Sequence, residues 1–203
     1  MRKVHIVGRD HGIEQMFIRR GWELVNTIDI FTDLIQFTGG KDVDPSYYGE
    51  TRHAATRSNP ARDAAEAAIF NEWMGIVPMA GICRGAQFLN VMGGGKLWQH
   101  VTGHALSGTH RALCVESGEM LDVTSTHHQM MIPGDMGTVL MTAAVAGQKS
   151  NAVKTFLREG SPDVEAVYYP HSMSVCYQPH PEYVGASAAC QEKYFAYLEE
   201  YIL

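Results

Sequence analysis

Short apolar segments alternate with amphipathic ones through the first half of the chain. Helical spacing of apolar positions predicts a helix over residues 13–20, and Asn59 followed by Pro60 is a good start for a second one. Four apolar segments have the length and composition of buried strands, at residues 4–7, 22–25, 33–37 and 76–80. Strands that alternate with helices in this way predict an α/β fold with a parallel sheet.

The second half of the chain has a different pattern, in which strands follow one another directly. Residues 112–116 and 120–124 flank a polar turn and predict a hairpin, and residues 139–145 predict a further strand. A second strand pair is expected at residues 165–169 and 173–178, and an amphipathic helix at residues 187–201. We therefore expect a mostly parallel sheet with a small antiparallel extension.

The strand predicted at residues 76–80 runs into Gly-Ile-Cys-Arg-Gly-Ala-Gln at residues 81–87, where a helical pattern begins. A reactive side chain between two glycines at a strand-to-helix junction is typical of a nucleophile elbow. The free N–H groups and positive dipole end of the helix favour the thiolate form of Cys83. The alternative is a buried, inert cysteine that packs as a small hydrophobic residue.

A second ligand-binding pattern follows the strand predicted at residues 33–37. Gly39 and Gly40 lie at the carboxyl end of that strand, the edge where open α/β sheets bind ligands. Paired glycines there allow backbone N–H groups to face a ligand. The alternative is an ordinary turn, for which glycine is a common residue.

At the end of the last predicted strand, His180 lies between Pro179 and Pro181, and Glu182 follows Pro181. In extended backbone, residues two apart point to the same side, and Pro179 and Pro181 favour that conformation. Glu182 is thus expected to orient His180, and His180 to accept the proton of Cys83. A histidine that simply packs in a proline-rich turn is the alternative.

Composition limits the class of protein and of partner. The chain has 203 residues, 45% of them hydrophobic, and we expect a single domain over residues 1–203. The 16 basic and 22 acidic residues give a formal net charge of −6, which favours a small-molecule substrate over nucleic acid. The sequence shows no pattern of a signal peptide or of a membrane span. Its four cysteines do not have the spacing of zinc ligands, and they suit a reducing, cytoplasmic location. No cofactor is expected.

Half of the ten histidines lie in one region, namely His100, His104, His110, His127 and His128. A structural zinc site needs about four ligands in a defined geometry, and Gly103 breaks any helix that would align the first two of these histidines. We therefore expect solvated or hydrogen-bonded loop histidines and no metal site.

The elbow at residues 81–87 and His180-Pro181-Glu182 together resemble the class I glutamine amidotransferase superfamily. The closest likeness is to its γ-glutamyl hydrolase-like branch, the peptidase C26 group. Further motifs of that branch match in the same order, at residues 39–45, 48–50, 62–63, 90–99 and 125–129. The likeness extends from about residue 34 to residue 182.

The resemblance implies a flavodoxin-like, doubly wound fold and a cysteine-dependent C–N hydrolase. Cys83 would attack a γ-carboxamide carbon to form a γ-glutamyl thioester, with His180 as acid and base and Glu182 orienting it. The backbone N–H groups of Gly40 (or Gly39) and Arg84 would form the oxyanion hole. Three side chains would line the glutamyl pocket, namely those of Gln87, His127 and His128.

Two activities are compatible with this resemblance. The first is a glutaminase subunit that supplies ammonia to a separate synthetase or ligase, because nothing in the chain resembles a synthetase domain. The second is a γ-glutamyl hydrolase that cleaves a γ-glutamyl-amine or peptide without a partner. The short loops favour the first activity, and the likeness to the branch favours the second.

Overall fold

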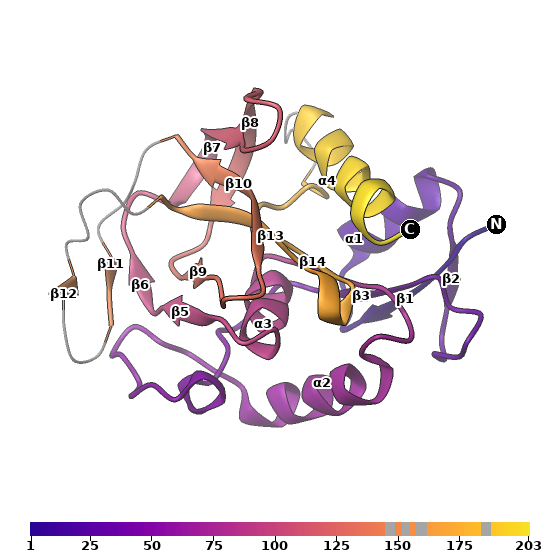
Figure 1. Ribbon diagram of the computed structural model, residues 1–203, viewed down its shortest axis with the longest axis horizontal. Coiled ribbons are helices and arrows are strands. Elements are labelled where there is room, and N and C mark those ends of the chain that lie inside the picture. The colour runs from indigo at the N-terminus through magenta and orange to yellow at the C-terminus, as the bar shows by residue number, and fades with distance from the viewer. Residues whose placement is uncertain (145–148, 152–154, 157–161, 184–187) are drawn as a thin grey trace.

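The computed structural model describes residues 1–144, 149–151, 155–156, 162–183 and 188–203 (Figure 1). Its first half alternates strands and helices, as the hydrophobic pattern predicted. The elements of this half are β1 Lys3–Val7, α1 His11–Arg19, β2 Glu23–Val25, β3 Leu34–Phe37, the 3-10 helix η1 Pro45–Tyr48, α2 Pro60–Trp73, β4 Met79–Ile82 and α3 Arg84–Met92.

The second half contains mainly strands and ends in one long helix. Its elements are β5 Lys96–Trp98, β6 His100–Val101, β7 Ala105–Cys114, β8 Met120–Thr126, β9 Met130–Ile132, β10 Thr138–Ala143, β11 Lys149–Ser150, β12 Thr155–Phe156, β13 Val164–Tyr169, the 3-10 helix η2 Pro170–Ser172, β14 Ser174–Tyr177 and α4 Ala188–Tyr201. The expected hairpin is β7–β8 and the expected strand pair is β13–β14. Residue 145 of one predicted strand and residue 187 of the last predicted helix lie outside the described residues.

One large sheet forms the centre of the molecule, with strand order β2-β1-β3-β4-β14-β13-β10-β7-β8. The strands from β2 to β14 are parallel, and those from β13 to β8 form the antiparallel extension. β9 pairs with β13 and β5, while β6, β11 and β12 form a separate small sheet. The α/β class with a parallel sheet and an antiparallel extension is confirmed.

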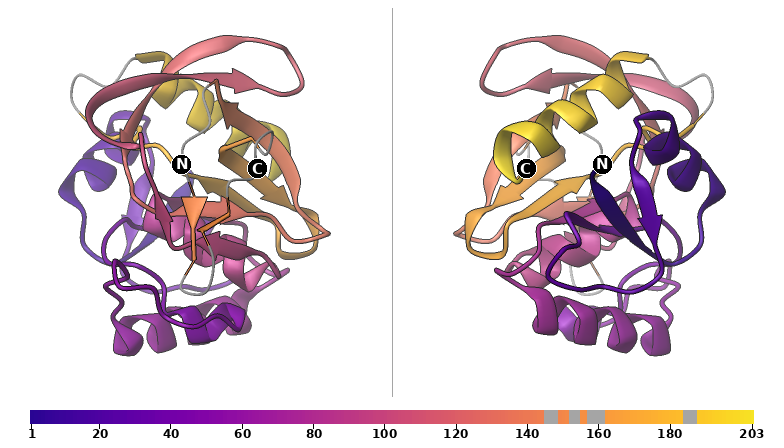
Figure 2. Two further views of the ribbon diagram at one scale, coloured as in Figure 1. Left: turned by 90° about the vertical axis from the view of Figure 1, so that its left-hand side faces the viewer. Right: turned by 90° about the vertical axis from the view of Figure 1, so that its right-hand side faces the viewer.

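Helices cover both faces of the parallel strands (Figure 2). Neighbouring strand residues pack in different hydrophobic clusters, one on each face. On β3, Leu34 packs in the cluster that contains α1 and α4, whereas Ile35 packs in the cluster that contains α2 and α3. The strands β3, β4 and β14 are buried along their whole length, and their sequences lack the apolar–polar alternation of a half-exposed sheet. The doubly wound arrangement predicted from the resemblance is therefore present.

Local sequence explains where the helices begin, and it corrects one strand boundary. The side chains of Asp10 and Asn59 accept hydrogen bonds from the first turns of α1 and α2. The strand predicted at residues 76–80 is instead Met79–Ile82, because Ile76 remains 59% exposed and Pro78 has no N–H to donate. This shift places Gly81 inside the strand, next to the following helix. Among the described residues, no helix has both the length and the apolar character needed to cross a membrane.

Candidate active site

Cys83 occupies a sharp turn between β4 and α3. Its backbone has φ 53° and ψ −111°, a conformation that costs a residue with a side chain about 1–3 kcal/mol. A Cβ atom on Gly81 would lie 2.3 Å from the carbonyl carbon of Gly85, and one on Gly85 would lie 2.3 Å from the oxygen of Phe37. The two glycines therefore allow the strand, the turn and the helix to pack in direct backbone contact, which holds the strained residue in place.

His180 and Glu182 lie beside one another at the end of β14. His180 Nδ1 is 2.6 Å from Glu182 Oε1, and both side chains are largely buried. Residues 181–182 form a turn, so the extended backbone that the prolines suggested is absent here. The turn nevertheless brings the carboxylate to the imidazole and leaves Nε2 of the ring for another partner.

The backbone of His180 is held by a residue from the antiparallel extension. Its N–H donates to Thr124 Oγ1 over 2.6 Å, and that hydroxyl donates to the carbonyl of His180 over 3.2 Å. Tyr183 stacks on the imidazole with 4.3 Å between ring centroids. No motif in the sequence identified Thr124, because its role depends on β8 lying beside the end of β14.

Three chain segments converge on the imidazole. A Cβ atom on Gly39 would lie 3.3 Å from His180 Cε1 and 3.7 Å from Cys83 Cβ. These residues follow β3, β4 and β14, which are adjacent parallel strands and therefore end at the same edge of the sheet. The sheet order thus places a thiol, an imidazole and a glycine-rich backbone together.

Electrostatics favour the charged form of the His180 ring. Burial lowers the pKa of His180, but hydrogen bonds with Cys83 and Glu182 oppose this effect, and the net result is a pKa of about 11. A protonated imidazole beside the sulfur stabilises a thiolate, the nucleophilic form of cysteine. The pair can therefore attack an electrophilic carbon and then provide a proton to the group that leaves.

We expect His180 to be doubly protonated at pH 8, because its raised pKa lies well above that value. NMR spectra of histidine-labelled protein would measure this directly, and Cys83→Ala should lower the pKa of His180 by removing one of the two groups that raise it. The pKa is higher in the folded state than the ordinary value of 6.5. Protonation of His180 should therefore stabilise the fold fully below pH 6.5, and progressively less as the pH rises toward 11. A neutral ring at pH 8 would contradict this assignment.

Arg62 on α2 holds the glycine-rich loop in place. Its guanidinium donates to the carbonyl of Gly39 over 2.9 Å and to that of Thr38 over 3.0 Å. Gly40 has φ +139°, and a Cβ atom there would lie 2.4 Å from Arg62 Nη1. A side chain at residue 40 would therefore be strained and would also displace the arginine. The sequence singled out Arg62 only as part of a family motif.

The side chain of Arg84 points away from the cavity and into the interface with α2. It is 1% exposed, and its guanidinium forms ion pairs with Asp63 and Glu66. Burial and the nearby Arg62 lower the pKa of Arg84 to about 10, which leaves the guanidinium charged at neutral pH. Only the backbone of Arg84, at the first position of α3, remains available to a ligand.

A cavity of about 260 Å³ brings most of the predicted site residues together. Gln87 lies in its wall, with its amide donating to Gln178 Oε1 over 3.0 Å and to the carbonyl of Gln129 over 3.3 Å. The cavity is lined by Gly40, Lys41, Asp42, Arg57, Cys83, Arg84, Gln87, Thr126, His127, His128 and Gln129. Both signs of charge are present in this wall, as a zwitterionic ligand requires.

The two predicted pocket histidines differ in their surroundings. His128 is partly exposed and lies 3.0 Å from Asp42, whose hydrogen bond raises the pKa of His128. Burial lowers the pKa of His127 to about 4, so its ring is neutral. Asp42 was part of a family motif in the sequence but was not predicted to pair with a histidine.

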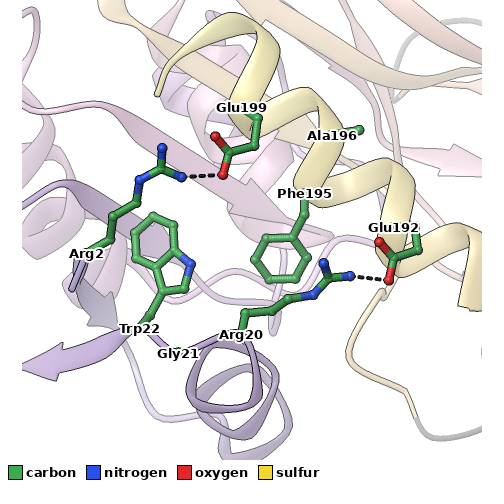
Figure 3. A pocket seen from close by; sticks show the side chains of 8 residues that line it. All are labelled: Arg2, Arg20, Gly21, Trp22, Glu192, Phe195, Ala196 and Glu199. Carbon is green, nitrogen blue, oxygen red and sulfur yellow. Dashed lines mark hydrogen bonds and ion pairs between the residues drawn. The ribbon is translucent and has the colours of Figure 1, made fainter.

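A larger cavity of about 430 Å³ lies between α4 and the segment that joins α1 to β2 (Figure 3), and it shares no lining residue with the cavity of Cys83. It is crossed by the ion pairs Arg2–Glu199 and Arg20–Glu192. The guanidinium of Arg20 also lies 4.6 Å from the centre of the Phe195 ring. These charged groups are already paired with one another, and the residues described in the cavity wall include no cysteine, serine, threonine or histidine.

Comparison with known proteins identifies the family of this chain. A model of the family described as peptidase C26 matches residues 16–182. The chain belongs to the peptidase C26 family. A Mycobacterium tuberculosis protein, provisionally named a glutamine amidotransferase, is 37% identical over 131 residues, which cover 54% of this chain and 42% of that protein. Each of these matches covers 42% or less of the length of the curated relative.

Solved structures share the fold of this peptidase C26 family member. A glutamine amidotransferase from Thermotoga maritima aligns with a TM-score of 0.63 at 14% identity, covering 98% of this chain and 83% of that chain. A chain of the PurLQS structure from the same organism aligns with a TM-score of 0.61 at 17% identity, covering 97% of this chain and 99% of that chain. The flavodoxin-like fold predicted from the resemblance is therefore confirmed.

Proposed function

We propose that this protein is a cysteine-dependent glutaminase that hydrolyses the γ-amide of glutamine and supplies the ammonia to a separate synthetase or ligase. The observation that carries the proposal is the strained turn at Cys83, which holds the sulfur beside the His180–Glu182 pair. Membership of the peptidase C26 family supports the same class of chemistry.

The thiolate of Cys83 attacks the γ-carbonyl carbon, and the carbonyl π electrons move to the oxygen. When the tetrahedral intermediate collapses, the C–N bond breaks and the nitrogen takes a proton from His180, so ammonia leaves and a γ-glutamyl thioester remains. His180, now neutral, removes a proton from water, and the resulting hydroxide attacks the thioester. The C–S bond then breaks, which releases glutamate and regenerates the thiolate.

Two backbone N–H groups are proposed to stabilise the oxyanion, those of Gly40 and Arg84, with Gly39 as the alternative on the loop. Gly40 and Arg84 line the cavity that contains Cys83, and Arg62 holds the loop rigid through the carbonyl of Gly39. Donors that are fixed before the reaction need no reorganisation as charge develops, which is the basis of oxyanion-hole catalysis.

The glutamyl part of the substrate is proposed to bind against the side chain of Gln87, with His127 and His128 at the same wall. Glutamine has one carboxylate and one ammonium group beside its α-carbon. Lys41 and Arg57 provide positive charge in this wall, and Asp42 provides negative charge. These are complementary to the two charged groups of the substrate.

The ammonia acceptor is proposed to lie on a partner protein. One structural neighbour is a chain of an assembly named PurLQS, and another, from Thermoplasma acidophilum, is provisionally described as part of a GMP synthase. The alternative function is a γ-glutamyl hydrolase that cleaves a γ-glutamyl-amine or peptide without a partner. The exposed side of the cavity at His128, with a side chain 36% exposed, favours this alternative because a larger leaving amine could extend there.

Release of ammonia or amine by the purified protein distinguishes the two functions. We expect slow turnover of L-glutamine, since a glutaminase of this kind depends on its synthetase, and little turnover of a γ-glutamyl-amine such as γ-glutamyl-methylamide. Cys83→Ala provides the background rate for each substrate. Rapid turnover of the γ-glutamyl-amine with little from glutamine would overturn the glutaminase proposal in favour of the hydrolase.

A further inference from the structure

A cluster of imidazole and carboxylate groups lies buried beside the candidate active site. His104 precedes β7, His110 lies on β7 and Glu165 lies on β13, and one donor atom from each lies within 4.8 Å of the others. In the strand order, β10 lies between β7 and β13, and its last residue is Ala143. The cluster forms at that end of β10, where side chains of the two flanking strands reach each other.

The carboxylate of Glu165 is fully buried, and its contacts are imidazoles. Oε1 lies 3.0 Å from His110 Nε2 and 3.5 Å from His104 Nδ1, and Oε2 lies 3.8 Å from His127 Nε2. Within the part of the chain that the structure describes, no lysine or arginine pairs with Glu165, and neither carboxylate oxygen has a hydrogen-bond partner. A buried carboxylate is costly unless a cation compensates its charge.

The rings of two histidines are oriented by groups outside the cluster. His104 Nε2 lies 2.7 Å from Asp163 Oδ2, so its Nδ1 faces Glu165. His127 Nδ1 lies 2.9 Å from the carbonyl oxygen of Gln129, so its Nε2 faces Glu165. Histidines that bind metals commonly have the second ring nitrogen held by a carboxylate or a backbone carbonyl in this way.

His127 contributes a further imidazole beside the carboxylate of Glu165. Its Nε2 atom is buried and has no hydrogen-bond partner among the described residues.

We propose that His104, His110 and Glu165 bind a zinc ion, with Nε2 of His127 as the fourth donor. Neutral imidazoles and a carboxylate form the nitrogen and oxygen donor set that zinc accepts in a tetrahedral site. The positive charge of the ion compensates the buried carboxylate of Glu165. Because His127 also lines the cavity of Cys83, the ion fixes one wall of the candidate active site.

The proposed zinc site differs from the expectation that the histidines of this region are solvated or hydrogen-bonded loop residues. The spacing of His100 and His104 predicted no shared site, and His100 is absent from the cluster. The missing donor is Glu165, which lies far away in the sequence on another strand. Only the pairing of the sheet brings it to His104 and His110.

The metal content of the full-length protein tests the proposal. The protein should be purified without a polyhistidine tag and analysed by inductively coupled plasma mass spectrometry. We expect roughly one zinc ion per chain. Removal of the ion with a chelator should lower the Tm, and added zinc should restore it. Replacement of the zinc ion by Co²⁺ should give the visible absorption bands of tetrahedrally coordinated cobalt.

Variants locate the ion. Glu165→Gln and His110→Ala should reduce the bound zinc to near zero, whereas His11→Ala removes an exposed imidazole at the start of α1 and should leave the zinc content unchanged. If the cluster variants do not fold, competition between the unaltered protein and a chromophoric chelator still measures the zinc affinity. These measurements do not depend on catalytic activity, so a failure of the zinc proposal can be distinguished from a failure of the proposed function.

Protein that contains no zinc, takes up none when zinc chloride is added, and keeps its Tm in chelator would overturn the proposal. The cluster would then be a polar network in which a protonated histidine compensates Glu165. Stoichiometric binding of another divalent ion, lost in Glu165→Gln, would overturn the assignment of zinc.

Discussion

Exchange of Cys83 for alanine is expected to reduce turnover by at least about 10⁴-fold, because the alanine side chain cannot form the thioester. The fold should be retained, since the side chain of Cys83 is only partly buried. Steady-state ammonia release from glutamine, measured with equal amounts of folded protein, gives the ratio of rates. Circular dichroism and the Tm would establish that the variant is folded.

Cys114→Ala is the matched control for this prediction. Cys114 is buried on β7 and belongs to the hydrophobic core, so its replacement should leave turnover unchanged. A Cys83→Ala protein that keeps a substantial share of the activity, or a Cys114→Ala protein that loses it, would contradict the role of Cys83 as nucleophile.

Arg84→Met is expected to destabilise the protein by about 3–5 kcal/mol, the cost of breaking a buried ion pair from one side. Asp63 and Glu66 are fully or nearly fully buried, and both form ion pairs with this guanidinium. Methionine has a similar volume, so the loss would reflect the removal of this buried positive charge more than a cavity. Urea unfolding followed by circular dichroism measures the free energy of unfolding.

Two further variants separate charge from packing at this site. Arg2→Met breaks the exposed pair with Glu199 and should cost no more than about 1 kcal/mol. In Arg84→Met, Glu66 keeps its ion pair with Arg62, whereas Asp63 loses its pair with Arg84. Addition of Asp63→Asn removes this second, buried charge and should recover part of the stability. If the double variant is no more stable than Arg84→Met, the destabilisation comes from packing and the electrostatic explanation is wrong.

The elbow could be predicted because its chemistry is local. Gly81 and Gly85 lie within two residues of Cys83, and their lack of Cβ atoms is a property of the sequence itself. The structure adds the reason for each glycine, since Gly81 packs against the backbone of α3 and Gly85 against that of β3. The boundary of β4 was wrong by a few residues, because an apolar run does not reveal that Ile76 lies outside the sheet.

The surroundings of the site could not be predicted in the same way. Arg84 was expected to contribute a backbone N–H, but nothing local revealed that its guanidinium is buried against α2. Thr124 holds the backbone of His180 only because β8 passes the end of β14. Both contacts join residues that are far apart in the chain, so they depend on how the elements pack.

The sequence by itself determined the α/β class, the strained turn that presents Cys83 and the pairing of His180 with Glu182. Each of these depends on residues close together in the chain, through hydrophobic period, the absence of Cβ atoms or a short separation. The tertiary structure alone decided which strand ends share an edge, where the guanidinium of Arg84 points, and that Glu165 meets His104 and His110. Sheet order and the packing of helices on its faces control these contacts, and both arise from burial of apolar surface over the whole chain.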